Sequence, residues 1–380
     1  MKLWMLISTP GGLEDVASSE VSRFARNVSV LDTGLIRAEG DEHSVARLNI
    51  WGRTFTRVLI GVCEGELRDL NDVVREVYNA GDEVLKFFRD GHTFAVRCDR
   101  SGKHGFTSVD AAREVGGAIH RMALSAGLDV KVNLDSPTVE FVLKIRGDRF
   151  YLGVNSSGEG LNRRGYRVYS HPAALNPVIA AAMVMMLGWG GEDMLVDPMC
   201  GGATIPIEAA MIALNYAPGL YRGRHPLVDI PFIEPEVYWA ERRRALESRR
   251  GPDRKVAYAI DISRKHLEGG IRNAESAGVR GAIEFIEGDS RRLTRYLKRG
   301  SYWFATNPPY GIRMTRREAL PSLYRGVLSS LREVGAERGA VITSETSVLE
   351  DAAQRSGYGI VEKRRVMHGN LETYVYILSL

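Results

Sequence analysis

Two short stretches carry residue types that could do chemistry, and the first covers residues 194–208. It reads Met-Leu-Val-Asp-Pro-Met-Cys-Gly-Gly-Ala-Thr-Ile-Pro-Ile-Glu, which is typical of a strand, a tight turn and the start of an apolar helix. Gly201 and Gly202 lack a Cβ, so a ligand could approach their backbone amides beside the positive end of the helix dipole. The same turn would also suit plain packing, because Gly-Gly after a strand is common in α/β proteins.

The second stretch, residues 303–311, reads Trp-Phe-Ala-Thr-Asn-Pro-Pro-Tyr-Gly. The lone pair of an exocyclic amine on a nucleobase is delocalised into the ring, so the amine must be turned toward a methyl donor before it can react. The side-chain carbonyl of Asn307 and the backbone carbonyl of Pro308 could accept its two hydrogens and aim the lone pair. Tyr310 could stack on a base extruded from its helix, and Arg313 could meet a phosphate or face solvent.

Two carboxylates follow neighbouring predicted strands. Asp261 ends the run at 257–261, where it could accept hydrogen bonds from both ribose hydroxyls of a nucleoside-containing ligand. Asp289 follows the run at 283–286 and could accept from an adenine amine. Either carboxylate alone could instead be a helix N-cap. The turn lacks the Gly-x-Gly-x-x-Gly and Gly-x-x-x-x-Gly-Lys patterns, which disfavours dinucleotides and nucleoside triphosphates as ligands.

The motifs at 197–204 and 307–310 together resemble the first and fourth motifs of S-adenosylmethionine-dependent methyltransferases that act on exocyclic amino groups. The family more often has Gly-Ser-Gly-Thr where this chain has Gly-Gly-Ala-Thr. The resemblance implies S-adenosyl-L-methionine as the cofactor and catalysis by Asn307, Pro308 and Tyr310. It also implies a set of cofactor-binding residues: Asp197, Met199, Gly201, Gly202, Ala203, Thr204, Asp261, Ile262, Asp289, Ser290 and Asn307.

The elements that must hold these residues form an α/β unit over 178–380. Apolar strand-like runs alternate with helical patterns up to residue 343, which predicts a parallel sheet covered by helices on both faces. The runs at 358–367 and 373–380 predict an antiparallel hairpin at the end of the chain. A parallel sheet that ends in a reversed strand is the arrangement of Rossmann-like methyltransferases.

Two smaller α+β units precede this sheet. Residues 1–65 show strand, helix and two further strand patterns, and residues 66–165 show a second mixture of helices and strands. Residues 166–177 form a linker with two prolines. Asn176 could be the N-cap of the helix that follows, or it could lie beside the methionine end of the cofactor, as the corresponding segment does in related enzymes.

Two glycine-containing basic loops, 97–106 and 156–167, lie in the second unit. Bases next to glycine and an aromatic ring suit a phosphate backbone and a stacked base, although a solvated loop would look alike. The insertion at 215–254 is also rich in arginine, and it could be either an RNA contact or a solvent-facing helix. The two loops supply the predicted RNA-binding residues: Arg97, Arg100, Lys103, Arg163, Arg164 and Arg167.

Together with residues 133–149, these loops resemble a THUMP domain, an RNA-binding module that a ferredoxin-like domain usually precedes. The implied fold class is α/β, with a Rossmann-like class I methyltransferase domain preceded by α+β ferredoxin-like and THUMP domains. In that family the module and its neighbour grip the acceptor stem and 3′ end of tRNA. The implied partner is therefore tRNA.

Taken whole, the chain is similar to tRNA guanosine N2-methyltransferases that act at position 6 of the acceptor stem. Relatives that modify position 10 usually have Asp-Pro-Pro-Tyr, so Asn307 favours position 6. A ribosomal RNA guanosine N2-methyltransferase, an adenine N6-methyltransferase and an RNA-binding protein without catalysis stay open as alternatives. The thiouridine synthase branch is disfavoured because its ATP-pyrophosphatase loop is missing.

Length and composition limit the class of protein that this chain can be. A chain of 380 residues with 44% apolar and 26% charged residues predicts a folded protein of two or three domains. The three cysteines form no Cys-x-x-Cys pair, so neither disulfides nor a metal is expected. The longest apolar run, 178–187, is too short to span a membrane, so we expect a cytoplasmic protein. We also expect it to be a monomer. A formal charge of +4 permits nucleic-acid binding without requiring it.

Overall fold

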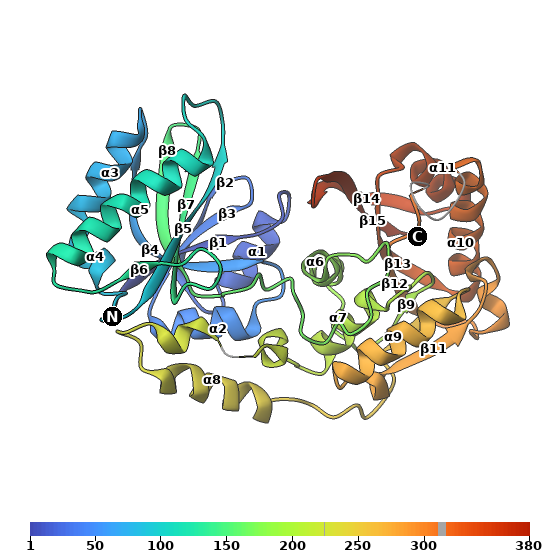
Figure 1. The fold of residues 1–380 in the computed structure, drawn as a ribbon. Helices are drawn as coiled ribbons and strands as arrows, with labels where there is room; N and C mark the ends of the chain where they lie inside the picture. Colours follow the sequence, from blue (N-terminus) through green and yellow to red (C-terminus); the bar gives the residue numbers. More distant parts are fainter. Residues whose placement is uncertain (224, 311–316) are drawn as a thin grey trace.

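The computed structural model describes residues 1–223, 225–310 and 317–380. Within these residues the chain forms two helix-covered β-sheets that lie side by side (Figure 1). The first contains eight strands: β1 Leu3–Ser8, β2 Arg26–Asp32, β3 Leu35–Gly40, β4 Arg57–Glu66, β5 Thr93–Ser101, β6 Lys131–Val132, β7 Val139–Arg146 and β8 Arg149–Asn155. The second contains seven: β9 Met194–Asp197, β10 Ala257–Asp261, β11 Ile283–Glu287, β12 Tyr302–Thr306, β13 Ala336–Thr343, β14 Gly359–His368 and β15 Leu371–Ser379.

The first sheet runs through both N-terminal units. Its strand order is β2-β3-β1-β4-β8-β7-β5-β6, and β4 pairs antiparallel with β8. Residue 65, the boundary expected between the two N-terminal units, lies within β4. The division into separate domains therefore stays a prediction. Five helices accompany this sheet in the described chain: α1 Glu14–Val21, α2 Glu42–Trp51, α3 Leu70–Asn79, α4 Gly81–Leu85 and α5 Ser108–Ser125.

The second sheet confirms the doubly wound α/β arrangement. Its order is β11-β10-β9-β12-β13-β15-β14, with parallel pairing from β11 to β13 and antiparallel pairing of β15 with both of its neighbours. The helices α6 Pro177–Leu187, α7 Thr204–Ala213 and α9 Arg264–Ser276 pack in one apolar cluster, and α10 Leu320–Val334 and α11 Thr346–Ser356 in another. Strands β9 and β12 are apolar up to their last residues, Asp197 and Thr306, because helices cover both of their faces.

The insertion after α7 connects the two sheets. It contains η1 Pro218–Tyr221, η2 Pro226–Asp229 and α8 Pro235–Glu247, and α8 lies along α2 of the first half (Figure 1). Glu241 on α8 accepts hydrogen bonds from Trp51 Nε1 at 2.9 Å and from Arg47 Nε at 3.3 Å. A Cβ added to Gly219 would lie 2.6 Å from the Asn49 carbonyl oxygen, so only glycine permits this close approach. One face of the insertion is therefore an internal contact between the two halves.

Three short 3₁₀ helices complete the described elements: η3 Arg280–Ala282, η4 Ser290–Arg295 and η5 Arg317–Ala319. Among the helices of the described residues, none has the length and apolar character needed to cross a membrane. The same part of the chain holds no group of three or more His, Cys, Asp or Glu side chains arranged to bind a metal ion.

Candidate active site at the carboxyl ends of the parallel strands

The glycine turn after β9 is held against the end of β10. Gly201 has a φ of +51° and Ala203 a φ of +60°, so the turn passes through the left-handed region before α7 begins at Thr204. The Gly201 N–H donates to Asp261 Oδ2 at 2.8 Å, and the Ser263 N–H donates to Asp261 Oδ1 at 2.8 Å. Both oxygens of the Asp261 carboxylate are therefore oriented, and each keeps a lone pair for a further donor.

Asp197, the last residue of β9, lies under this turn. Its side chain is buried, and its Oδ1 accepts from the Met199 N–H at 3.2 Å. Burial raises the pKa of Asp197 to about 7, and this effect outweighs the hydrogen bond from Met199, which acts in the opposite direction. Because Asp197 is buried beneath the turn, its role in binding a cofactor would be to shape the turn.

Replacing Asp197 by asparagine is expected to flatten the pH dependence of stability between about pH 4 and pH 7. The ordinary pKa of 3.8 is raised to about 7 in the folded chain, so folding takes up a proton over this range. Stability from this group is therefore fully present below the ordinary pKa and is lost as the pH rises through the folded pKa. Thermal melts from acid to neutral pH measure the effect. The variant Asp253→Asn changes an exposed residue and should keep the wild-type pH dependence of stability. If Asp197→Asn also kept the wild-type pH dependence, the raised pKa of Asp197 would be contradicted.

The second carboxylate lies at the end of the next strand, because β11 pairs parallel with β10. Asp289 binds the Arg291 guanidinium through both oxygens, at 2.9 Å from Nε and 2.8 Å from Nη2. The hydrogen bond from Arg291 lowers the pKa of Asp289, so this carboxylate stays ionised as an acceptor. Ser290 beside it is buried, whereas the Ile262 side chain is 70% exposed and offers an apolar surface next to Asp261.

The Asn-Pro-Pro-Tyr corner follows β12, which pairs parallel with β9. Asn307 Nδ2 donates to the Ala173 carbonyl oxygen of the linker at 3.4 Å, and the Tyr310 hydroxyl donates to Asn307 Oδ1. Burial raises the pKa of Tyr310, so its hydroxyl stays a donor at neutral pH. The side-chain amide of Asn307 is thus held at both ends. Arg313, predicted to meet a phosphate or solvent, lies outside the described residues.

The corner is also fixed from behind by α10 and β13. The hydroxyl of Tyr324 donates to the Pro309 carbonyl oxygen at 3.0 Å and lies 2.9 Å from Thr343 Oγ1. Tyr324 and Thr343 are both buried. Two prolines and a buried tyrosine therefore leave the backbone at Asn307 little freedom.

The linker lies across the glycine turn, an arrangement that the sequence did not predict. Asn273 on α9 accepts from the Tyr169 N–H at 2.7 Å, and its Nδ2 donates to the carbonyl oxygens of Tyr169 and Gly202, both at 3.0 Å. The Tyr169 hydroxyl lies 2.6 Å from His266 Nδ1, and the His171 ring packs on the His266 ring with centroids 4.2 Å apart. The one sequence signal for Asn273 is its place on the same helix face as Gly269 and Gly270, four and three residues before it.

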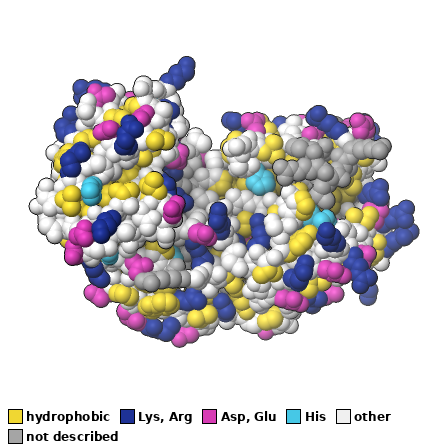
Figure 2. All heavy atoms as spheres, in the orientation of Figure 1, with side chains coloured by type: hydrophobic (Ala, Val, Ile, Leu, Met, Phe, Trp, Pro, Cys, Tyr) yellow, Lys and Arg dark blue, Asp and Glu magenta, His cyan; other side chains and the backbone are white. Residues whose placement is uncertain are grey.

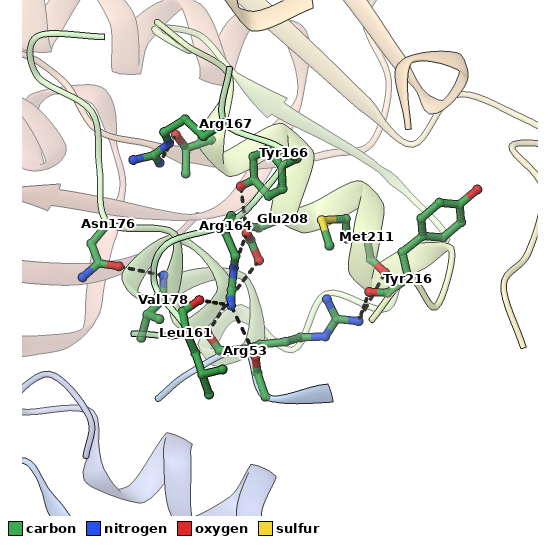
Figure 3. Close-up of polar contacts among 12 residues, drawn as sticks. Arg53, Leu161, Arg164, Tyr166, Arg167, Asn176, Val178, Glu208, Met211 and Tyr216 are labelled. Carbon is green, nitrogen blue, oxygen red and sulfur yellow. Dashed lines mark hydrogen bonds and ion pairs between the residues drawn. The ribbon is translucent and has the colours of Figure 1, made fainter. Parts of the chain in front are cut away.

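Arg164 corrects the predicted RNA-binding set. Its side chain is only 2% exposed, with Nε 3.0 Å from Glu208 Oε1 and Nη2 3.4 Å from Glu208 Oε2 (Figure 3). The Tyr166 hydroxyl donates to Glu208 Oε1 at 2.8 Å. A buried guanidinium that is held by a carboxylate cannot reach a phosphate in solution, so the predicted contact is wrong for Arg164.

Asn176 and Arg167 meet the methyltransferase half beside this buried pair (Figure 3). Asn176 caps α6, because its Oδ1 accepts from the Val178 N–H at 3.0 Å. Arg167 is half-buried, and its Nη2 donates to the Leu175 carbonyl oxygen at 2.9 Å and to Thr204 Oγ1 at 3.0 Å. Arg167 therefore contacts the first residue of α7, directly after the glycine turn.

The remaining predicted RNA contacts differ in their accessibility. Arg100 is half-buried, with Nη1 3.3 Å from the Gly102 carbonyl oxygen and 2.9 Å from His104 Nδ1. Three predicted contacts are exposed: Arg97, Lys103 and Arg163. Their contact with RNA stays a prediction.

Family models match three consecutive segments of the chain. A RlmL ferredoxin-like domain matches residues 5–59, a THUMP domain matches residues 68–155, and an RMKL-like methyltransferase domain matches residues 164–374. These matches confirm the resemblance to THUMP-domain methyltransferases.

Known proteins agree with these matches. The chain is 33% identical to the "tRNA (guanine(6)-N2)-methyltransferase" of Methanocaldococcus jannaschii, across 97% of this chain and 98% of that protein. It is 34% identical to a protein of the same name from Archaeoglobus fulgidus, across 98% and 91%. The crystal structure of a possible methylase from Clostridium difficile 630 superimposes with a TM-score of 0.88 at 26% identity, across 100% of this chain and 98% of the other. The chain therefore belongs to the family of RMKL-like methyltransferases that carry ferredoxin-like and THUMP domains.

Proposed function

We propose that this chain transfers a methyl group from S-adenosyl-L-methionine to the exocyclic N2 amine of guanosine 6 in the acceptor stem of tRNA. The pairing of β9 with β12 supports the proposal most directly. Phe304 lies beside Val196 in parallel register, so the glycine turn and the Asn-Pro-Pro-Tyr corner leave the sheet next to each other. The two archaeal relatives carry this activity in their names, which favours position 6 over position 10.

The residues at the strand ends fit the proposed cofactor. Asp261 offers two oriented oxygens to the ribose hydroxyls, and the ionised Asp289 offers an acceptor to the adenine amine. The exposed Ile262 would cover part of the purine ring with apolar surface. When bound, the cofactor supplies an electrophilic methyl group, and the remaining chemistry falls to the chain itself.

Asn307 and Pro308 would orient the nucleophile. The Asn307 side-chain oxygen and the Pro308 backbone oxygen would accept the two amine hydrogens, which turns the nitrogen lone pair toward the methyl group. The Tyr310 hydroxyl donates to Asn307 Oδ1, so that oxygen already has a fixed direction. The nitrogen–methyl bond forms as the sulfonium–methyl bond breaks, and the amine then releases a proton to water. No strong base is required.

The amine can reach the corner only if the nucleotide leaves its stem. Tyr310 would stack on the extruded base, and the first half would hold the tRNA while this happens. In the described structure the exposed Arg97 and Lys103 are candidates for phosphate contacts in that half. One chain supplies every residue named here, so we propose that it acts as a monomer.

Transfer of labelled methyl groups to a tRNA transcript tests the function. We expect label in a transcript with guanosine at position 6, N2-methylguanosine in its nuclease digest, and no label when position 6 is adenosine. N6-methyladenosine would overturn the choice of base. Label at position 10, or only in a ribosomal RNA fragment, would overturn the choice of target. Binding without transfer would identify an RNA-binding protein that lacks catalysis.

A further inference from the structure

A cavity of about 500 Å³ lies between the linker and the methyltransferase half, next to the site described above. Figure 2 shows that the surface is hollowed between the two lobes of the molecule. The cavity combines residues that follow β8, the N-cap of α6 and the end of β14. Its polar lining comprises Asn162, Arg163, Arg164, Arg167, Asn176 and His368.

The lining contains three arginines and no carboxylate. Glu208 neutralises Arg164, but no carboxylate of the described residues lies within ion-pair distance of Arg167. Among the described residues Arg163 forms an ion pair only with Glu159, at 3.2 Å, and both side chains are 71% exposed, so that pair is weak. Arg167 therefore keeps its positive charge at the cavity wall, and this cavity suits an anion.

His368 adds a neutral donor to the lining. Burial lowers the pKa of His368, and the charge of Arg167 lowers it further. The Nε2 atom of its neutral ring accepts from the Asn176 N–H at 3.3 Å, which puts the ring proton on Nδ1. The cavity thus offers two guanidinium groups that no buried carboxylate of the described residues neutralises, and one imidazole N–H.

The cavity also borders the proposed reaction centre. Ala174, in its wall, follows Ala173, whose carbonyl oxygen accepts from Asn307, and consecutive Cα atoms are only about 3.8 Å apart. Arg167 contacts Thr204 at the end of the glycine turn. A strand that delivers a base to Asn307 would therefore place a neighbouring phosphate within reach of the cavity.

We propose that this cavity binds the backbone phosphate next to the methylated nucleotide, an inference that rests on the proposed function. Arg163 and Arg167 bind the phosphate oxygens, and His368 donates to the same group. Arg164 acts as a positioning residue, since Glu208 fixes the loop between the two contacts. The carboxylate of the cofactor is a poorer occupant, because Gly201 and Gly202 of the glycine turn are absent from the cavity wall in the described residues.

The variants Arg163→Gln and Arg167→Gln, measured with a tRNA transcript and S-adenosylhomocysteine, test this inference. Each change should weaken RNA binding about tenfold at low salt. The number of phosphate contacts, obtained from the slope of the dissociation constant against salt concentration, should fall by about one. A methylphosphonate beside the methylated nucleotide should weaken wild-type binding similarly and add little in Arg167→Gln. The affinity of Arg163→Gln for S-adenosylhomocysteine alone, measured by calorimetry, should not change.

Arg299→Gln is the matched control. Arg299 is exposed and lies just before the amino end of β12, whereas the site lies at the carboxyl ends of the strands. Its replacement should leave RNA binding at the wild-type level. Arg167→Lys, which keeps the positive charge, should recover part of the RNA affinity that Arg167→Gln loses. If Arg167→Gln lost affinity because it misfolded, restoring the charge would not recover binding. If both glutamine variants of an active enzyme bound RNA as tightly as the wild type, the inference would be overturned. A selective loss of S-adenosylhomocysteine binding in Arg163→Gln would overturn it too. An inactive wild-type enzyme would instead refute the proposed function.

Discussion

Asn307→Ala is expected to lower the rate of methyl transfer by about 10³-fold while tRNA affinity stays nearly unchanged. The variant loses the oxygen that would accept an amine hydrogen and aim the lone pair, an interaction that matters most in the transition state. The side chain has few structural duties in the described residues, since it donates to Ala173 at a long 3.4 Å and accepts from Tyr310. Single-turnover rates with saturating cofactor, measured beside tRNA binding, separate the two effects.

Tyr310→Phe provides the matched comparison for this prediction. It keeps the ring that would stack on the base but removes the hydroxyl that orients Asn307 Oδ1. We expect an intermediate loss of rate, of about fivefold, because a neutral hydrogen bond contributes about 1 kcal/mol. If Asn307→Ala lowered tRNA affinity as strongly as the rate, the residue would be an RNA contact and its proposed role would be wrong.

Glu208→Ala is expected to lower the free energy of unfolding by about 3 to 5 kcal/mol. Glu208 is buried between Arg164 and Tyr166, so its removal leaves a guanidinium without its counter-charge in the interior. The removal of Glu208 would also destabilise the charged form of the nearby Arg53. Burial lowers the pKa of Arg53 to about 10, and the charge of Glu208 acts against that shift. Urea unfolding followed by tryptophan fluorescence measures the loss.

Two further variants check that burial is the cause. Glu159→Ala removes an exposed partner of Arg163 and should change stability by less than about 0.5 kcal/mol. The double variant Arg164→Met and Glu208→Leu removes both charges of the pair and should recover part of the loss, because the Arg164 guanidinium no longer stays buried without its counter-charge, and Arg53 keeps the nearby charge of Glu20. Wild-type stability of Glu208→Ala would show that the pair is solvated in solution.

The elements of the methyltransferase half could be predicted closely because their signals are local. The hairpin expected at 358–367 and 373–380 forms as β14 Gly359–His368 and β15 Leu371–Ser379, with a tight turn between two strand-like runs. Parallel pairing then brings the ends of β9, β10, β11 and β12 to one edge of the sheet, as the alternation of strands and helices predicts. In the first half the helix Glu42–Trp51 was missed, since its apolar positions show little periodicity.

Residue types and spacing alone thus determined the strands and helices of the doubly wound sheet, the turn at Gly201 and the corner at Asn307. Each of these elements depends on a few consecutive residues. Only the tertiary structure separated Arg163 from Arg164, which look equivalent in sequence. Glu208 lies 44 residues beyond Arg164 and buries it, while Arg163 stays at the surface. The contact of Asn273 with the linker, 104 residues away, was likewise invisible. Side chains far apart in the chain become neighbours only when the sheets and helices pack, and no local pattern encodes that distance.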